Sequence, residues 1–113
     1  DPRAESYALG YLGGLYEQQQ QWPAAQQLTE QALRLAEVSN TPDIAYRWAW
    51  QLGRLQKRQG DLPAATAAYS SAVKMLGKLW NDLISTNLDV QFSFRESVEP
   101  VYRELVALLL ETA

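Results

Sequence analysis

The sequence predicts an all-α fold, in which two helical hairpins and a C-terminal helix stack as a right-handed α-α superhelix. Two observations lead to this prediction. Residues of matching size recur at a fixed offset of forty positions, and apolar residues keep helical spacing through most of the chain. A repeat period in this range is typical of stacked helical repeats. Apolar residues at i, i+3, i+4 and i+7 form one face of a helix.

The forty-residue offset defines two repeats within a single domain, residues 1–113. The matching positions are Leu12-Gly13 with Leu52-Gly53, Trp22-Pro23-Ala24-Ala25 with Leu62-Pro63-Ala64-Ala65, Ala32 with Ala72, and Leu35 with Met75. Small, large and proline positions that all match at one offset are hard to obtain by chance. We therefore expect the first repeat over about residues 4–39 and the second over about residues 42–86.

Each repeat is expected to hold two helices. Asp1-Pro2 and Thr41-Pro42 combine a capping side chain with a proline at the first helical position, which is the signal for a helix start. Pro23 and Pro63 open the second helices. The predicted inward residues of the four helices are Leu9, Leu12 and Tyr16; Ala25, Leu28, Ala32 and Leu35; Ala45, Ala49, Leu52 and Leu55; Ala65, Tyr69, Ala72, Leu76, Leu79, Trp80 and Leu83.

Small residues are expected where the two helices of a hairpin cross. Gly13 and Gly53 would let the backbones approach, and alanines of the partner helix would pack against them. Those alanines are Ala25, Ala32, Ala65 and Ala72. A larger residue at such a contact costs about 1–3 kcal/mol through overpacking.

These positions resemble the tetratricopeptide repeat, whose pattern is W-x2-LG-x2-Y, then A-x3-F, then alanine and a closing proline. The first repeat carries Leu9, Leu12-Gly13, Tyr16, Ala25 and Ala32, and the second carries Ala49, Leu52-Gly53, Gly60-Asp61, Ala65, Tyr69 and Ala72. Thr29 replaces the aromatic residue, Gln56 replaces the tyrosine, and both closing prolines are missing. The period is also longer than usual, so either the turn around residues 37–43 or its flanking helices must be extended.

Residues 87–96 interrupt the helical pattern. Val90, Phe92 and Phe94 alternate with polar residues, as in a strand, but no partner strand is evident. We interpret this segment as an extended connector whose three apolar side chains anchor it to the helical stack. A C-terminal helix is expected over about residues 97–112, with Pro100 weakening its first turn.

The segment 89–110 resembles part of large cyanobacterial proteins in which tetratricopeptide repeats precede a C-terminal CHAT domain, a caspase-like module. This resemblance rests on the runs VQFSFR, VEPVYR and LLL. It implies that the chain is the interaction part of a protease-like protein. The catalytic histidine and cysteine of that family have no counterpart in the chain, so no catalytic residue is carried over.

Composition narrows the function classes. The chain has no cysteine and no histidine, which removes thiolate chemistry and the commonest general base and metal ligand. A formal net charge of −3 disfavours nucleic acid, and no apolar run approaches the 18 residues of a membrane span. We expect no enzyme activity, cofactor or metal, and a cytoplasmic location. The chain opens without methionine, so a signal peptide in a longer parent protein stays open.

The tetratricopeptide resemblance implies a concave groove, lined by the first helix of each repeat, that binds a protein or peptide. The predicted groove residues are Tyr7, Tyr11, Arg47, Trp50, Gln51, Arg54, Lys57 and Arg58, with Gly14, Glu17 and Gln18 on the same side. Arginine with an aromatic neighbour suits acidic peptides. Two alternatives stay open: a solvated helix face with Trp50 packed under arginine stems, or a contact with another domain of the parent protein.

Other conspicuous residues are interpreted as structural. We expect Trp22 to anchor a hairpin, because Leu62 is its equivalent in the second repeat, and Trp48 and Trp80 to pack. Glu96, Glu99 and Glu104 are interpreted as surface charges, with Glu99 and Arg103 spaced as an i, i+4 ion pair. The wide apolar surface of the last helix, with Val106 and Leu110, indicates that it packs against a partner. In a longer parent protein the partner would be the next helix of the superhelix; in this chain the helix would fold back as a cap or form a dimer.

Overall fold

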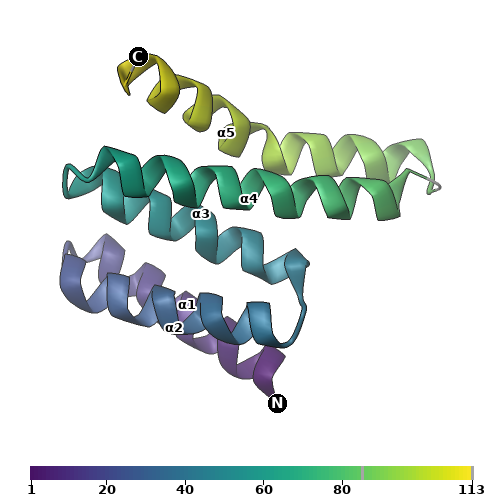
Figure 1. Ribbon diagram of the computed structural model, residues 1–113. Coiled ribbons are helices and arrows are strands. Elements are labelled where there is room, and N and C mark those ends of the chain that lie inside the picture. The colour runs from purple at the N-terminus through teal and green to yellow at the C-terminus, as the bar shows by residue number, and fades with distance from the viewer. Residues whose placement is uncertain (85, 113) are drawn as a thin grey trace.

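Five helices form the chain in the computed structural model, which describes residues 1–84 and 86–112. They are α1 (Pro2–Gln18), α2 (Trp22–Val38), α3 (Pro42–Arg58), α4 (Leu62–Leu83) and α5 (Leu88–Thr112). Figure 1 shows α1–α2 and α3–α4 as two hairpins, one above the other, with α5 running along α4. The predicted all-α fold of two hairpins and a C-terminal helix is confirmed.

The first four helices are joined by three connections of the same design. Each connection has three residues, and its middle residue is left-handed: φ is 60° at Gln20, 53° at Asn40 and 83° at Gly60. The turn between the repeats is therefore no longer than the turns within them. Because α1, α2 and α3 each have 17 residues, the forty-residue period comes from extended helices.

Prolines and capping side chains set the helix starts. The Asp1 carboxylate accepts a hydrogen bond from the backbone N–H of Arg3, and Asp61 accepts one from Ala64, both at 3.2 Å. Thr41 precedes α3 as predicted, but its hydroxyl donates to the carbonyl oxygen of Ala36 and does not cap the helix.

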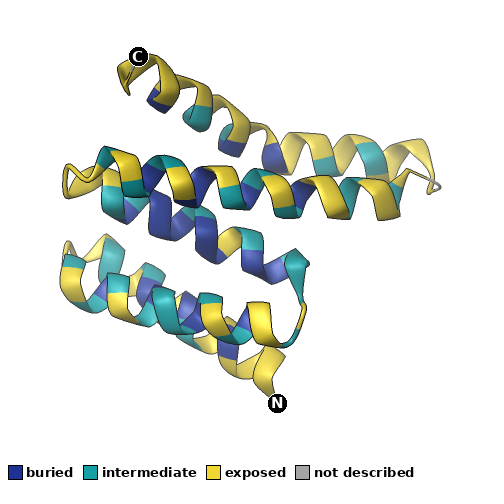
Figure 2. Cartoon of the chain, in the orientation of Figure 1, coloured by how far each residue is buried: buried dark blue, intermediate teal, exposed yellow. Residues whose placement is uncertain are grey.

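The core is densest around α3, as the dark blue residues of Figure 2 show. The inward residues predicted for α3, from Ala45 to Leu55, are all buried. The stripe predicted for α1 is wrong in part, since Leu12 is 41% exposed. The buried residues of α1 are Ser6, Gly10 and Gly13, and the buried Ser6 hydroxyl donates to the Ala32 carbonyl oxygen at 2.6 Å. Hence α1 packs through small residues that let its backbone come close.

The predicted glycine crossings are confirmed. A Cβ atom on Gly13 would lie 2.7 Å from Thr29 Oγ1, and one on Gly53 would lie 2.7 Å from the Tyr69 ring. Ala25, Ala32, Ala65 and Ala72 are all fully buried. A further close approach was not predicted: a Cβ atom on Gly10 would overlap the indole of Trp48.

The predicted connector over residues 87–96 is wrong, because α5 is already helical from Leu88. The side chain of Asn87 accepts a hydrogen bond from the backbone N–H of Val90 at 2.9 Å, which is how a helix is capped. Of the three predicted anchors only Phe94 packs, stacked on Trp80 with ring centroids 6.0 Å apart. Val90 and Phe92 are exposed.

Pro100 lies inside α5 and does not begin it. Proline lacks the N–H that would bond to the preceding turn, so it bends a helix. Figure 1 shows α5 changing direction part-way along, so that its C-terminal part leaves the line of α4. Val98, Val101 and Leu108 still reach the core that α4 shares with α3.

Candidate functional site

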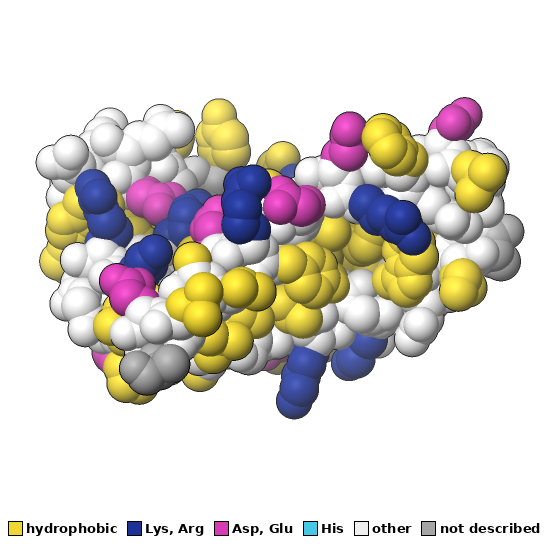
Figure 3. All heavy atoms as spheres, turned by 90° about the horizontal axis from the view of Figure 1, so that it is seen from above, with side chains coloured by type: hydrophobic (Ala, Val, Ile, Leu, Met, Phe, Trp, Pro, Cys, Tyr) yellow, Lys and Arg dark blue, Asp and Glu magenta, His cyan; other side chains and the backbone are white. Residues whose placement is uncertain are grey.

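A groove of about 660 Å³ is lined by side chains from all five helices, with α3 contributing the most. Its lining residues are Glu17, Trp22, Arg54, Lys57, Arg58, Tyr69 and Glu104. Three of these are cations and two are carboxylates. Figure 3 shows side chains of both charges gathered toward the left of the face seen from above.

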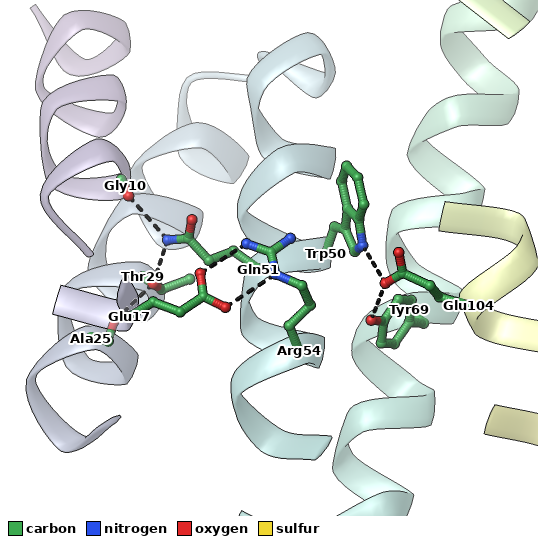
Figure 4. A network of polar contacts seen from close by, with 9 residues as sticks. All are labelled: Gly10, Glu17, Ala25, Thr29, Trp50, Gln51, Arg54, Tyr69 and Glu104. Atoms are coloured by element: carbon green, nitrogen blue, oxygen red, sulfur yellow. Dashed lines mark hydrogen bonds and ion pairs between the residues drawn. The ribbon is translucent and has the colours of Figure 1, made fainter. Parts of the chain in front are cut away.

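Arg54 is already paired inside this groove. Its Nε and Nη2 donate to the two oxygens of Glu17 at 3.1 and 2.9 Å, which ties α3 to α1 (Figure 4). The guanidinium also lies over the Trp50 ring, 5.2 Å from the centroid. Both partners are partly buried, so this bidentate pair holds the repeats together and its charge is largely neutralised.

Glu104 ties α5 to the second repeat. Its Oε1 atom accepts hydrogen bonds from Trp50 Nε1 at 2.9 Å and from the Tyr69 hydroxyl at 2.7 Å (Figure 4). Burial, and then the hydrogen bond to the Glu104 carboxylate, raise the pKa of Tyr69. The interpretation of Glu104 as a surface charge is therefore wrong. Glu99 does form the predicted surface pair with Arg103, at 3.1 Å.

Gln51 is not available to a ligand. It is 6% exposed, and its Nε2 atom donates to the Gly10 carbonyl oxygen at 3.0 Å and to Thr29 Oγ1 at 2.8 Å (Figure 4). Thr29 in turn donates to the carbonyl oxygen of Ala25. The small Thr29 leaves the room that Gln51 fills, and this polar cluster joins the two repeats from within. Placing Gln51 in the groove was wrong.

Of the three cations that line the groove, Lys57 and Arg58 remain available to pair with a ligand. Both are exposed at the C-terminal end of α3, and neither forms an ion pair within residues 1–84 and 86–112. The Arg58 guanidinium lies 4.8 Å from the centroid of the Trp22 ring. Trp22, with Arg58 over its ring, and Lys57 thus form one end of the groove.

Comparison with known proteins supports the repeat assignment. The chain is 34% identical over 74 residues to a TPR repeat-containing protein of the cyanobacterium Synechococcus elongatus. The match covers 66% of this chain but only 18% of that relative. The tetratricopeptide resemblance is confirmed. No family model matches the chain, and no solved structure matches it.

In the tetratricopeptide register, Thr29 of the first repeat corresponds to Tyr69 of the second, each packed against its glycine. The Tyr69 hydroxyl reaches Glu104 of α5, whereas the Thr29 hydroxyl meets Gln51 of α3. In both repeats, the residue at the aromatic position is therefore hydrogen-bonded by the helix that follows.

The remaining predicted residues of the tetratricopeptide groove lie elsewhere. Tyr7 and Arg47 line a second hollow of about 550 Å³ with Arg3 and Asp43, near the N-terminal ends of α1 and α3. There Arg3 donates to Asp43 and lowers the pKa of that carboxyl group. Tyr11 is 61% exposed and lines neither hollow. The eight predicted residues therefore do not form one surface.

Three groove residues were not predicted: Trp22, Tyr69 and Glu104. Trp22 was interpreted as a hairpin anchor by analogy with Leu62. The comparison of the two repeats could not show that Arg58 of α3 lies over the Trp22 ring. Trp48 and Trp80 do pack, Trp48 with its indole N–H donating to Ser6 and Trp80 between Phe94 and Arg95.

Neither a membrane-spanning helix nor a cluster of metal-binding side chains is found among the described residues. No helix among residues 1–84 and 86–112 is both long and apolar enough to cross a membrane. In the same residues, no three side chains of aspartate or glutamate come together as a metal site would require.

Proposed function

We propose that this chain is a non-catalytic protein–protein interaction module whose groove binds an extended segment of a partner protein. The observation that supports it most directly is the groove end formed by Trp22, Lys57 and Arg58, where two cations lack acidic partners among the described residues. The similarity to a TPR repeat-containing protein supports an interaction role in general.

The bound segment is expected to be acidic at this end. A carboxylate from a partner would pair with Lys57 and Arg58, while an apolar part of the segment packs beside Arg58 on the partly exposed Trp22 side chain. The two cations also lie in the last turn of α3, where they interact favourably with the helix dipole. A structural role of that kind does not require a ligand, so the experiment must measure binding.

A ligand can be obtained by phage display, in which random twelve-residue peptides are selected for binding to the 113-residue chain. We expect the selected peptides to be enriched in Asp or Glu. Lys57→Gln with Arg58→Gln should weaken binding of the best synthetic peptide about tenfold or more, because each charged hydrogen bond contributes roughly 1.5–3 kcal/mol. The matched control is Lys74→Gln with Lys78→Gln, exposed cations of α4 outside the groove.

Equal weakening by both double variants would show only a general charge effect. Selected peptides that bind both variants as tightly as the parent chain would place binding elsewhere, and the proposal would then be wrong. Failure to select any peptide above background would also count against it.

A second proposal keeps the same groove but places the partner in the same polypeptide, next to a CHAT domain. It is favoured by the resemblance over residues 89–110 and by the exposed apolar side chains of α5, Tyr102, Val106, Leu109 and Leu110. Reading the gene beyond Ala113 tests it: a downstream α/β domain with a histidine and a cysteine supports this alternative, and a nearby stop codon contradicts it.

A further inference from the structure

We infer that the segment bound in this groove carries charges of both signs, an acidic group for Lys57 and Arg58 and a lysine or arginine for Glu104. The inference rests on the proposed peptide-binding function and names the chemical class of its ligand. It differs from the expectation of a purely acidic ligand, because it assigns a binding role to α5.

The first support is the free oxygen of Glu104. Both hydrogen bonds that the carboxylate accepts, from Trp50 and Tyr69, go to Oε1. Oε2 accepts none from the described residues, and it is not among their buried atoms that lack a partner. Since an ionised carboxylate has about four acceptor positions, Oε2 offers an accessible, charged acceptor on the groove wall.

The second support is that Glu104 is held in place. Two donors on different helices, Trp50 of α3 and Tyr69 of α4, fix one oxygen and thereby orient the other. Figure 4 shows one carboxylate oxygen joined to both rings, while no dashed line reaches the second oxygen. A pre-oriented acceptor loses little conformational freedom when a ligand N–H binds, so more of the interaction contributes to affinity.

The third support is the charge balance of the lining. Arg54 and Glu17 neutralise each other through their bidentate pair. Of the lining charges, Lys57 and Arg58 at one end and Glu104 on α5 are left. A purely acidic segment would satisfy the two cations but bring like charge to Glu104, which is unfavourable in a partly desolvated groove. A segment with an acid and a base satisfies all three.

The test uses the best synthetic peptide from the phage selection and Glu104→Gln in the full chain. Glutamine keeps an oxygen for Trp50 and Tyr69 but removes the negative charge, so the helices should stay docked. We expect the selected peptides to combine Asp or Glu with Lys or Arg. Glu104→Gln should weaken the best one about tenfold, and replacing the peptide's basic residue with glutamine should have no further effect in that variant.

Glu96→Gln is the matched control, because Glu96 is an exposed acid of α5 outside the groove. Thermal unfolding followed by circular dichroism verifies that both variants keep their helices. Selected peptides that are only acidic, and that bind Glu104→Gln as tightly as the parent or more tightly, would overturn the inference. That outcome would leave the proposed function intact, whereas the absence of any groove-dependent peptide would overturn both.

Discussion

Close contacts at single glycines hold the hairpins of this chain together. Gly10 lies against the Trp48 indole. Gly13 lies against Thr29, and Gly53 lies against Tyr69. The Leu-Gly pairs of the repeat made Gly13 and Gly53 predictable. Gly10 has no glycine at the equivalent position of the second repeat, where Trp50 stands, so no repeat signal pointed to it.

Gly10→Ala should destabilise the fold by about 2 kcal/mol or more, since its methyl group would have to displace the buried Trp48 ring. Gly77→Ala is the control. A Cβ atom there meets nothing within 4 Å, and alanine favours a helix over glycine by up to about 1 kcal/mol. Urea unfolding of both variants measures the difference. A neutral Gly10→Ala would show that α1 and α3 are less closely packed than described.

Polar residues that are buried or partly buried were the hardest to predict. Gln51 was placed in the groove by the repeat register, and Glu104 was interpreted as a surface charge because no catalytic or metal-site pattern accompanies it. Neither argument reports which side chains approach from another helix. Their partners lie 22 to 54 residues away in sequence. No periodic pattern encodes such contacts.

At the level of elements, the starts of α1 and α3 followed from Asp1-Pro2 and Thr41-Pro42, while the start of α5 did not. Alternating Val90, Phe92 and Phe94 resembled an extended segment. The segment is helical because the Asn87 side chain caps the start of α5. Gln91 stabilises this helix start by donating to the carbonyl oxygens of Ile84 and Thr86. Local capping therefore outweighed a short alternating pattern.

The docking of α5 gives a pH prediction. The pKa of Tyr69 is raised above its ordinary value of 10.0 by burial and by the Glu104 carboxylate. The unfolded chain therefore releases this proton at lower pH than the folded chain does. The contribution of Tyr69 to the free energy of unfolding is fully present below about pH 10 and is lost as the pH rises from there toward the folded pKa.

Tyr69→Phe should lower stability at pH 7 by about 1–2 kcal/mol, through loss of the hydrogen bond to Glu104. The gap between the two proteins should then narrow as the pH rises above 10. Urea unfolding at pH 7 and at several values between 9.5 and 11 measures it. A gap that stays constant over this range would contradict the hydrogen bond between Tyr69 and Glu104.

At the level of the whole molecule, the sequence was enough for the repeat architecture, while the binding surface that it predicted on α3 stays a proposal. It was not enough for the surface's composition. Arg54 is engaged by α1, Trp50 is engaged by α5, and the available charges lie at Lys57, Arg58 and Glu104. These outcomes depend on how three helices meet, so they follow only once the stack is assembled.

The four tryptophans allow the central claim, that the groove binds a peptide, to be tested directly. Their indole N–H signals, followed by ¹⁵N–¹H NMR during titration with the selected peptide, report separate parts of the molecule. We predict that the signals of Trp22 in the groove and of Trp50, bonded to Glu104, move with the bound fraction. Those of Trp48, buried against Ser6, and Trp80, covered by Phe94 and Arg95, should stay in place. Movement of Trp80 alone, with Trp22 unchanged, would contradict the claim.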